Sequence, residues 1–318
     1  MTSVGIWKRI LTDAETILYE KESSEESCIE HSKSINGPFK FPLLKTKIIL
    51  VSGKDSQAFL HSQLTCDINN LADNASVLTS WCAPNGKIIC LMRVIACEEG
   101  FYLLLDENYH EQFLKKITIY VFNADVDFSD ESASLGTFIA RDCHENFQAK
   151  NKNIVCARDA DLCWFVGTSS ALLAIWRELK PEAIPLATKI LYDVRHLLPH
   201  LGKNQSDKFL PQELNLDRGA GLSFEKGCYP GQEIIARVKY RGTVKRTLKK
   251  LKSKNICDLP PKAEDNIVNS EGKKIGSILK VARSTDNISE ILAVLDTSTH
   301  STIFDEKLKC EFEISDID

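Results

Sequence analysis

Apolar and polar positions follow two different periods along the first half of the chain. Residues 45–53, KTKIILVSG, predict a strand that runs into a turn at Gly53. In the next stretch, 54–71, apolar side chains recur at close to helical spacing. This pattern predicts a helix, which Asp55 or Ser56 is placed to cap.

The pattern then returns to strands. Residues 76–106 predict two or three strands, with Pro84-Asn85-Gly86 as a hairpin turn because Asn-Gly tolerates positive φ. Residues 107–122 resume helical spacing, and residues 133–167 are again strand-like. Residues 168–180 predict a helix that ends at Pro181. This mixture of hairpins and helices predicts an α+β chain rather than a doubly wound one.

The two ends of the chain differ from the middle. Residues 1–40 predict a short amphipathic helix and a polar Ser/Glu-rich linker. After Gly242 the helical signal disappears, and short strand candidates split by Gly, Asn, Asp and Ser predict a C-terminal β-barrel over 241–318. Between these ends we assign an α+β core to 41–125 plus 188–240, and a second α+β part to 126–187.

Composition narrows the class of protein. Of the 318 residues, 43% are hydrophobic and 26% are charged, with a net charge of −4. These values are ordinary for a globular protein, and no apolar run is long enough to span a membrane. The acidic N-terminal stretch argues against a transit peptide. We therefore expect a cytoplasmic protein, with a monomer as the default.

The eleven cysteines show no C-x-x-C spacing, and we predict neither a metal site nor a disulfide framework. Cys82, Cys90 and Cys97 lie in or beside apolar segments that predict strands, so we interpret them as buried thiols.

Cys228 has a different setting, in the stretch FEKGCYPGQEIIARVKYRG. Gly227 and Gly231 bracket it, and Pro230 suits the first turn of a helix that follows. The exposed amides of that helix and the ammonium of Lys226 would both favour a thiolate. Such a thiolate could be a nucleophile, a redox sensor or a transient metal ligand, while the alternative is a cysteine packed under the turn. No histidine lies nearby in sequence to act as its base.

The same stretch resembles the K-G-C-Y-x-G-Q-E signature of the YgfZ family, which is related to the glycine-cleavage T-protein. Residues 209–217, FLPQELNLD, are similar to the family's F-x-P-Q-x-x-N-L segment. Residues 59–88 resemble its Q-x-T-x-D helix end and the hairpin that follows.

The resemblance implies three domains with ferredoxin-like and Greek-key parts and a C-terminal β-barrel. It also implies tetrahydrofolate as cofactor, iron–sulfur client or assembly proteins as partners, and a role with cluster enzymes that modify tRNA. The implied catalytic residues are Cys228, Lys226 and Glu233. The implied folate-binding residues are Gln63, Thr65, Asp67, Arg195, Tyr229, Gln232 and Arg237.

Two departures from the relatives change the expected chemistry. The T-protein has an aspartate after the hairpin that handles a proton in aminomethyl transfer, whereas this chain has Cys90-Leu91 there. We therefore predict that the chain does not catalyse aminomethyl transfer. Where many relatives carry I-E-A-G, this chain has Val194-Arg195-His196-Leu197. Either the pterin is held differently, or Arg195 and Lys189 bind another anion such as a polyglutamate tail; a plain surface pair is the alternative.

The stretch 237–254 carries nine basic residues and no acidic one. It could contact tRNA, dock an acidic partner protein or be a solvated strand face. Three functions thus stay open: a folate-dependent factor for iron–sulfur proteins acting through Cys228, a folate-dependent one-carbon transferase, and a tRNA-binding module. We favour the first, as a non-enzymatic or weakly catalytic factor, because the chain combines a distinctive thiol with a folate-type scaffold that lacks the transferase aspartate.

Overall fold

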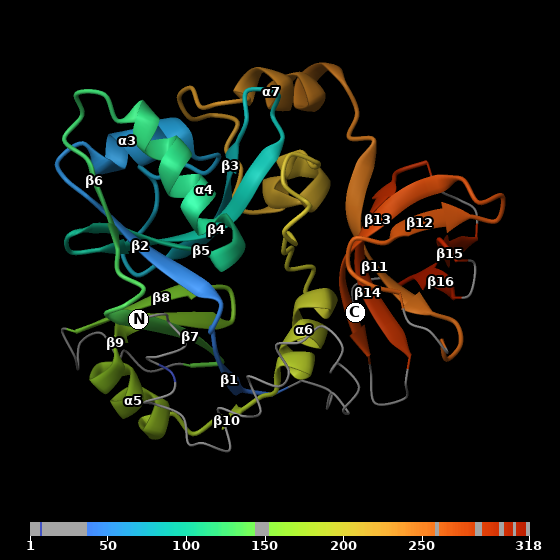
Figure 1. Ribbon diagram of the computed structural model, residues 1–318, viewed down its shortest axis with the longest axis horizontal. Helices are drawn as coiled ribbons and strands as arrows, with labels where there is room; N and C mark the ends of the chain where they lie inside the picture. The colour runs from blue at the N-terminus through green and yellow to red at the C-terminus, as the bar shows by residue number, and fades with distance from the viewer. Residues whose placement is uncertain are drawn as a thin grey trace.

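The strands of the described residues form two five-stranded sheets and one closed barrel, which lies at the right of Figure 1. The computed structural model describes Trp7 and residues 37–143, 153–257, 261–283, 288–298, 302–307 and 310–315. The α+β class and the C-terminal barrel predicted from the sequence are confirmed. Apart from Trp7 and 37–40, the predicted N-terminal helix and linker lie outside the described residues.

The first sheet has the order β3-β4-β5-β2-β6, and its neighbouring strands are antiparallel. Its strands are β2 (Thr46–Ser52), β3 (Ser76–Cys82), β4 (Ile88–Cys97), β5 (Gly100–Asp106) and β6 (Asp127–Asp130). The predicted strand over 45–53 is confirmed, and so are the hairpins over 76–106. Gly86 sits in the β3–β4 turn with φ +78°, the left-handed conformation that favours glycine.

Helix α4 (Glu107–Ile117) covers this sheet and continues into the 3₁₀ turn η1 (Thr118–Tyr120). Tyr109, Phe113 and Ile117 recur every fourth residue, so they share one face and are buried in the sheet's core. The Asp106 carboxylate caps the helix by accepting from the Asn108 amide at 2.8 Å.

Helix α3 (Ser56–Gln63) is shorter than the helix predicted over 54–71. Asp55 is its N-cap, but the Asp55 carboxylate accepts from the Asp125 amide instead of a helix amide. The chain becomes extended at Leu64 because Leu64 and Thr65 pair with strand β3, where the Thr65 amide donates to the Ser80 carbonyl at 3.1 Å. The prediction was wrong beyond Gln63, since this pairing outweighs the helical periodicity.

The second sheet has the order β10-β1-β7-β9-β8. Its strands are β1 (Phe39–Pro42), β7 (Leu135–Arg141), β8 (Ile154–Asp159), β9 (Leu162–Thr168) and β10 (Glu182–Ala183). Helix α5 (Ser169–Glu178) buries Trp176 against it, and Trp7 packs edge-on to Trp176 with 5.5 Å between ring centroids. The predicted helix over 168–180 is confirmed.

The two sheets meet at Arg93 of β4, whose side chain is buried. Its guanidinium donates to the Asp159 carboxylate at 2.6 Å and to Ser76 Oγ at 3.0 Å, and it stacks over the Trp164 ring at 4.1 Å. A planar cation can make all these contacts at once, and they fix one sheet against the other.

The barrel closes in the order β11-β14-β13-β12-β15-β16. Its strands are β11 (Arg246–Ser253), β12 (Asn266–Asn269), β13 (Lys274–Arg283), β14 (Ser289–Asp296), β15 (Ile303–Asp305) and β16 (Glu311–Ile314). Cys257 and Cys310 form a disulfide within it, with 5.6 Å between their Cα atoms. The prediction that the chain has no disulfide framework was wrong for this pair, because the barrel brings together two cysteines that are 53 positions apart. Among the described helices, none has both the length and the apolar content needed to cross a bilayer.

Helix α6 (Leu186–Arg195) stands between the sheets and the barrel in Figure 1. The Asp193 carboxylate on this helix binds the ammonium groups of Lys189 and of Lys280 on β13, the second at 2.6 Å. Burial alone would raise the pKa of Asp193, but the two ammonium groups outweigh it and hold the pKa below its ordinary value. The carboxylate is therefore ionised and links the helix to the barrel.

Replacing Asp193 by Ala should lower the free energy of unfolding by about 3–5 kcal/mol, because two buried ammonium groups lose their carboxylate. Denaturant titration followed by tryptophan fluorescence measures the change. Lys54→Ala is the control, since it breaks an exposed pair with Asp125 (3.6 Å) and should cost less than about 1 kcal/mol. Similar small losses in both variants would contradict the buried link.

Candidate functional site

The cysteine loop, which we define as residues 223–231, carries Cys228 between the first sheet and helix α7 (Gln232–Arg241). The Cys228 residue is exposed. Of the other described cysteines outside the disulfide, all but Cys97 are buried, which confirms the prediction for Cys82 and Cys90. The prediction was wrong for Cys97, which ends strand β4 and is only half-buried. Cys228 is therefore the thiol that the described part of the chain presents to solvent.

The loop ends in a tight turn formed by Tyr229, Pro230, Gly231 and Gln232. Gly231 has φ +82° and ψ −1°, and the Gln232 amide donates to the Tyr229 carbonyl at 3.2 Å. These values, with proline second and glycine third, define a type II turn. Proline therefore precedes the helix instead of starting it as predicted, and Cys228 lies three residues before the N-cap, Gly231.

Gly231 is also in close contact with the β3–β4 hairpin turn. A Cβ atom at this position would come within 2.6 Å of both the Ala83 carbonyl oxygen and the Gly86 Cα. Only glycine can occupy this place without moving the backbone of one of the two turns. This contact fixes the C-terminal side of the cysteine loop.

The N-terminal side is fixed by Lys226, whose side chain is buried. Its ammonium donates to the carbonyl oxygens of His61, Leu64 (2.7 Å) and Cys66 (2.9 Å). His61 lies in the last turn of α3, and the other two residues follow the end of this helix. Burial lowers the pKa of Lys226 to about 8, so the group is still protonated at pH 7. Lys226 thus donates to the backbone of residues 61–66 and connects the cysteine loop to the end of α3.

Thr65 completes the connection between the two segments. Its hydroxyl is fully buried and donates to the Gly221 carbonyl at 2.8 Å, while its own carbonyl accepts from the Ser223 amide at 2.9 Å. The Thr79 hydroxyl donates to the same Gly221 carbonyl at 3.0 Å. The Thr65 side chain is therefore bonded to the backbone that leads into the cysteine loop and does not line the cavity.

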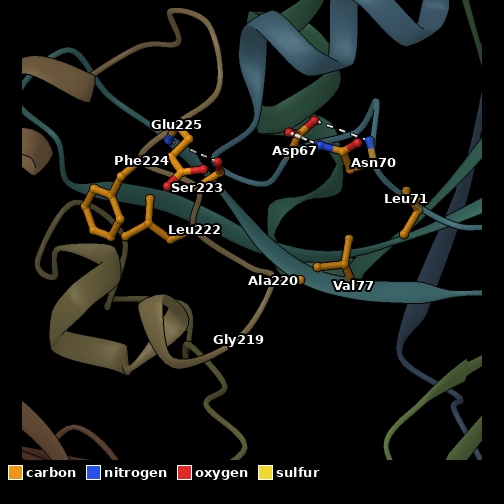
Figure 2. Close-up of a pocket in the computed structure, with 10 residues that line it drawn as sticks. All are labelled: Asp67, Asn70, Leu71, Val77, Gly219, Ala220, Leu222, Ser223, Phe224 and Glu225. Atoms are coloured by element: carbon orange, nitrogen blue, oxygen red, sulfur yellow. Dashed lines mark hydrogen bonds between the residues drawn. The ribbon is translucent and has the colours of Figure 1, made fainter.

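Asp67, in contrast, lines a cavity of about 420 Å³ beside the loop. Figure 2 shows its carboxylate next to Asn70, with Phe224 and Glu225 of the loop on the other side. The Asp67 carboxylate accepts from the amides of Asn69 and Asn70, and its second oxygen accepts from Asn70 Nδ2 at 2.7 Å. The wall also includes Leu71, Val77, Gly219, Ala220, Leu222 and Ser223.

Gln63, the first residue of the Q-x-T-x-D segment, ends helix α3. Its Nε2 donates weakly to Ser62 Oγ at 3.4 Å, and its buried Oε1 has no donor among the described residues. Gln63 is not among the residues that line the cavity. Of the three predicted residues of this segment, Thr65 therefore contacts the loop and Asp67 lines the cavity beside it, whereas Gln63 does neither in the recorded contacts of the described residues.

The remaining motif residues divide into two groups. Tyr229 is buried, and its hydroxyl donates to the Ser223 carbonyl at 3.4 Å. Glu233 and Arg237 form an exposed pair at 3.0 Å on α7, one turn apart. Gln232 opens that helix and is half-buried. Neither Glu233 nor Arg237 is among the residues that line the cavity.

Arg195 lies apart from this cluster, at the junction with the barrel. Its guanidinium forms a two-point contact with the Glu290 carboxylate of β14, at 2.9 and 2.5 Å. Hydrogen bonding to Glu290 raises the pKa of Arg195 further. Lys189 is bound to Asp193 in the same region. The predicted pair for an anionic ligand is therefore occupied by carboxylates of the chain itself.

Sequence reasoning also missed two residues of the segment FLPQELNLD that hold helix α7 and β11. Gln212 Nε2 donates to the Ile235 carbonyl at 2.7 Å. Glu213 is buried and binds the Arg246 guanidinium at 2.9 and 3.1 Å. Their place in the family's motif was visible in the sequence, but their partners come from segments more than twenty residues away.

The basic stretch 237–254 does not form one free cationic face. Arg246 binds Glu213, Lys254 binds Glu311, and Lys250 is buried in the barrel wall. Lys245 and Lys252 are exposed. The charge available to a phosphate backbone is therefore smaller than the sequence alone indicated.

Replacing Lys226 by Met should remove the three donated hydrogen bonds and leave three buried carbonyls unsatisfied. We expect a loss of about 3 kcal/mol in unfolding free energy and faster exchange of the Ser223 and Gln232 amides. Hydrogen exchange followed by mass spectrometry measures the second effect. Lys203→Met, at an exposed position, is the matched control. Unchanged exchange in the Lys226 variant would show that the loop is held by other contacts.

No protein-family model matches the chain. The tRNA-modifying protein YgfZ of Aliivibrio fischeri (strain MJ11) is 30% identical over 262 residues, which cover 78% of this chain and 82% of the relative. The tRNA-modifying protein YgfZ of Edwardsiella ictaluri (strain 93-146) is 31% identical over 273 residues, again 78% and 82%.

Among solved structures, the glycine cleavage system aminomethyltransferase T from Bartonella henselae matches with a TM-score of 0.72. The match covers 88% of this chain and 85% of that protein at 14% identity, which establishes a common fold. The predicted architecture is thereby confirmed. Together with the two sequence relatives and the cysteine loop, these comparisons show that the chain belongs to the YgfZ family.

Proposed function

We propose that this chain acts in tRNA modification, as a folate-binding factor that supports the assembly or repair of iron–sulfur proteins through Cys228. The sequence relatives are named tRNA-modifying proteins, and this supports tRNA modification as the process in which the chain acts. Both the folate and the iron–sulfur clients rest on the family resemblance of the cysteine loop and of residues 59–88.

The observation that carries the proposal is the way Cys228 is presented. The residue is exposed, yet the loop around it is fixed by the Lys226 hydrogen bonds on one side and by the Gly231 contact on the other. A cysteine with only a packing role would be buried like Cys82 or Cys90. An exposed thiol on a fixed backbone is suited to react with, or bind to, a partner.

The cavity beside Asp67 supports the folate part of the proposal. A pterin ring carries a row of N–H donors along one edge, and a carboxylate accepts from such an edge. Asp67 Oδ2 accepts one hydrogen bond, from Asn70 Nδ2, and so keeps a lone pair for a ligand. Apolar side chains such as Leu222 and Phe224 would cover the ring. In this arrangement Asp67 holds the pterin, and Arg195 stays with Glu290.

Aminomethyl transfer has less support. Cys90, which stands where the T-protein has its aspartate, is fully buried, and burial raises the pKa of its thiol far above the ordinary value. Leu91 beside it has no ionisable group. Neither residue can move a proton at neutral pH, so the scaffold is shared while that transfer chemistry lacks its base.

Cys228→Ala should leave the melting temperature within about 2 °C of the parent, because the side chain is exposed. In cells that depend on this chain, the same variant should lose cluster-dependent tRNA modification, measured by mass spectrometry of digested tRNA. Cys97→Ala, which removes a partly accessible thiol elsewhere, is the control and should retain it. Normal tRNA modification with the Cys228 variant would refute the role of the thiol.

Tetrahydrofolate should bind the purified protein, and Asp67→Asn should weaken binding by about 10-fold or more because a charged acceptor is lost. Calorimetric titration measures both. Asp73→Asn, which changes an exposed carboxylate on the neighbouring turn, is the control and should bind like the parent. Equal affinity of the Asp67 variant would place the folate elsewhere.

A further inference from the structure

His61 lies beside the cysteine loop, although 167 positions separate it from Cys228. It occupies the last turn of α3, where its carbonyl accepts from Lys226. Its side chain points between two neighbours. Nδ1 is buried, makes no hydrogen bond among the described residues and lies 3.3 Å from Asp67 Oδ1, while Nε2 lies 3.8 Å from the point where a Cβ on Gly227 would stand.

Gly227 is the residue directly before Cys228, so the imidazole lies against the backbone that carries the thiol. Consecutive Cα atoms are about 3.8 Å apart, and rotation about the Cα–Cβ bond of cysteine swings its sulfur through several ångström. Because Cys228 is exposed, its side chain is not packed into a single rotamer by the core. Glycine at 227 places no side chain between the imidazole and the thiol.

The surroundings of His61 keep it neutral. Burial and the nearby Lys226 ammonium lower the pKa of His61, and the Asp67 carboxylate opposes this only in part. A ring proton on Nδ1 would face the Asp67 carboxylate, whose Oδ1 is 3.3 Å away, and would leave the lone pair on Nε2. A neutral imidazole in this tautomer is a proton acceptor at the nitrogen that faces the cysteine loop.

We propose that His61, oriented by Asp67, is the base that takes the proton of the Cys228 thiol. The proposal deepens the proposed function, since it supplies the base that the sequence around Cys228 lacked. As Cys228 Sγ forms a bond to a soft electrophile, the S–H bond breaks and its proton moves to His61 Nε2. The leaving group of the electrophile departs with its electron pair, and Asp67 stabilises the imidazolium.

The alkylation rate of Cys228 with iodoacetamide tests this directly, because iodide leaves and no folate, client or tRNA is needed. At pH 7 the rate should fall at least about 10-fold in His61→Ala. Added imidazole should restore part of it, which a merely structural role of His61 would not allow. The part of the rise in rate with pH that follows deprotonation of His61 should be lost in this variant.

Two further variants complete the experiment. His61→Asn keeps a polar group facing Asp67 but offers no basic nitrogen, so it decides the question if His61→Ala does not fold. His200→Ala, which removes another histidine paired with a carboxylate (Asp106, 3.6 Å), should alkylate at the parent rate. A folded His61→Asn protein with the parent rate and pH profile would overturn the proposal. This outcome is independent of tRNA modification in cells, so the two proposals can fail separately.

Discussion

A single buried ammonium, that of Lys226, holds the two motif segments of this protein together. It forms no salt bridge with a carboxylate of the described residues and is stabilised by three carbonyl oxygens from residues 61–66. Those carbonyls are available because α3 stops at Gln63 and the chain then becomes extended. The Lys226 hydrogen bonds therefore attach the cysteine loop to the residues at and just beyond the end of α3.

This arrangement separates the fixing of the loop from its chemistry. In the motif, Lys226 donates hydrogen bonds to backbone carbonyls and Gly231 is in close contact with the hairpin turn. Tyr229 is buried in the core. Cys228 is left exposed, and the imidazole of His61 lies against the preceding residue, Gly227, with Asp67 on the other side of the ring. The reactive atoms thus come from one loop and from the end of one helix, both attached to the first sheet.

Much of the fold could be predicted from the sequence, because it depends on local patterns. The strand over 45–53, the Asn-Gly hairpin, the helix over 168–180 and the C-terminal barrel all follow from periodicity and turn residues. The site could be predicted less well. Lys226 and His61 meet across more than 160 positions, and Arg195 meets Glu290 across 95, so no local pattern shows which partner each has. The residue types of the site could be read from the motifs, whereas the partner of each residue depends on tertiary contacts.

The contact between Gly86 and Gly231 has a consequence for how this family can vary. Two turns from distant parts of the chain meet backbone to backbone, with no side chain between them that could absorb a change in spacing. Lengthening or reshaping the hairpin turn would displace the cysteine loop by a similar amount. A change of length in one turn therefore requires a matching change in the other. A deletion in the hairpin turn would move the backbone that carries Cys228, although the deleted residue does not contact the thiol.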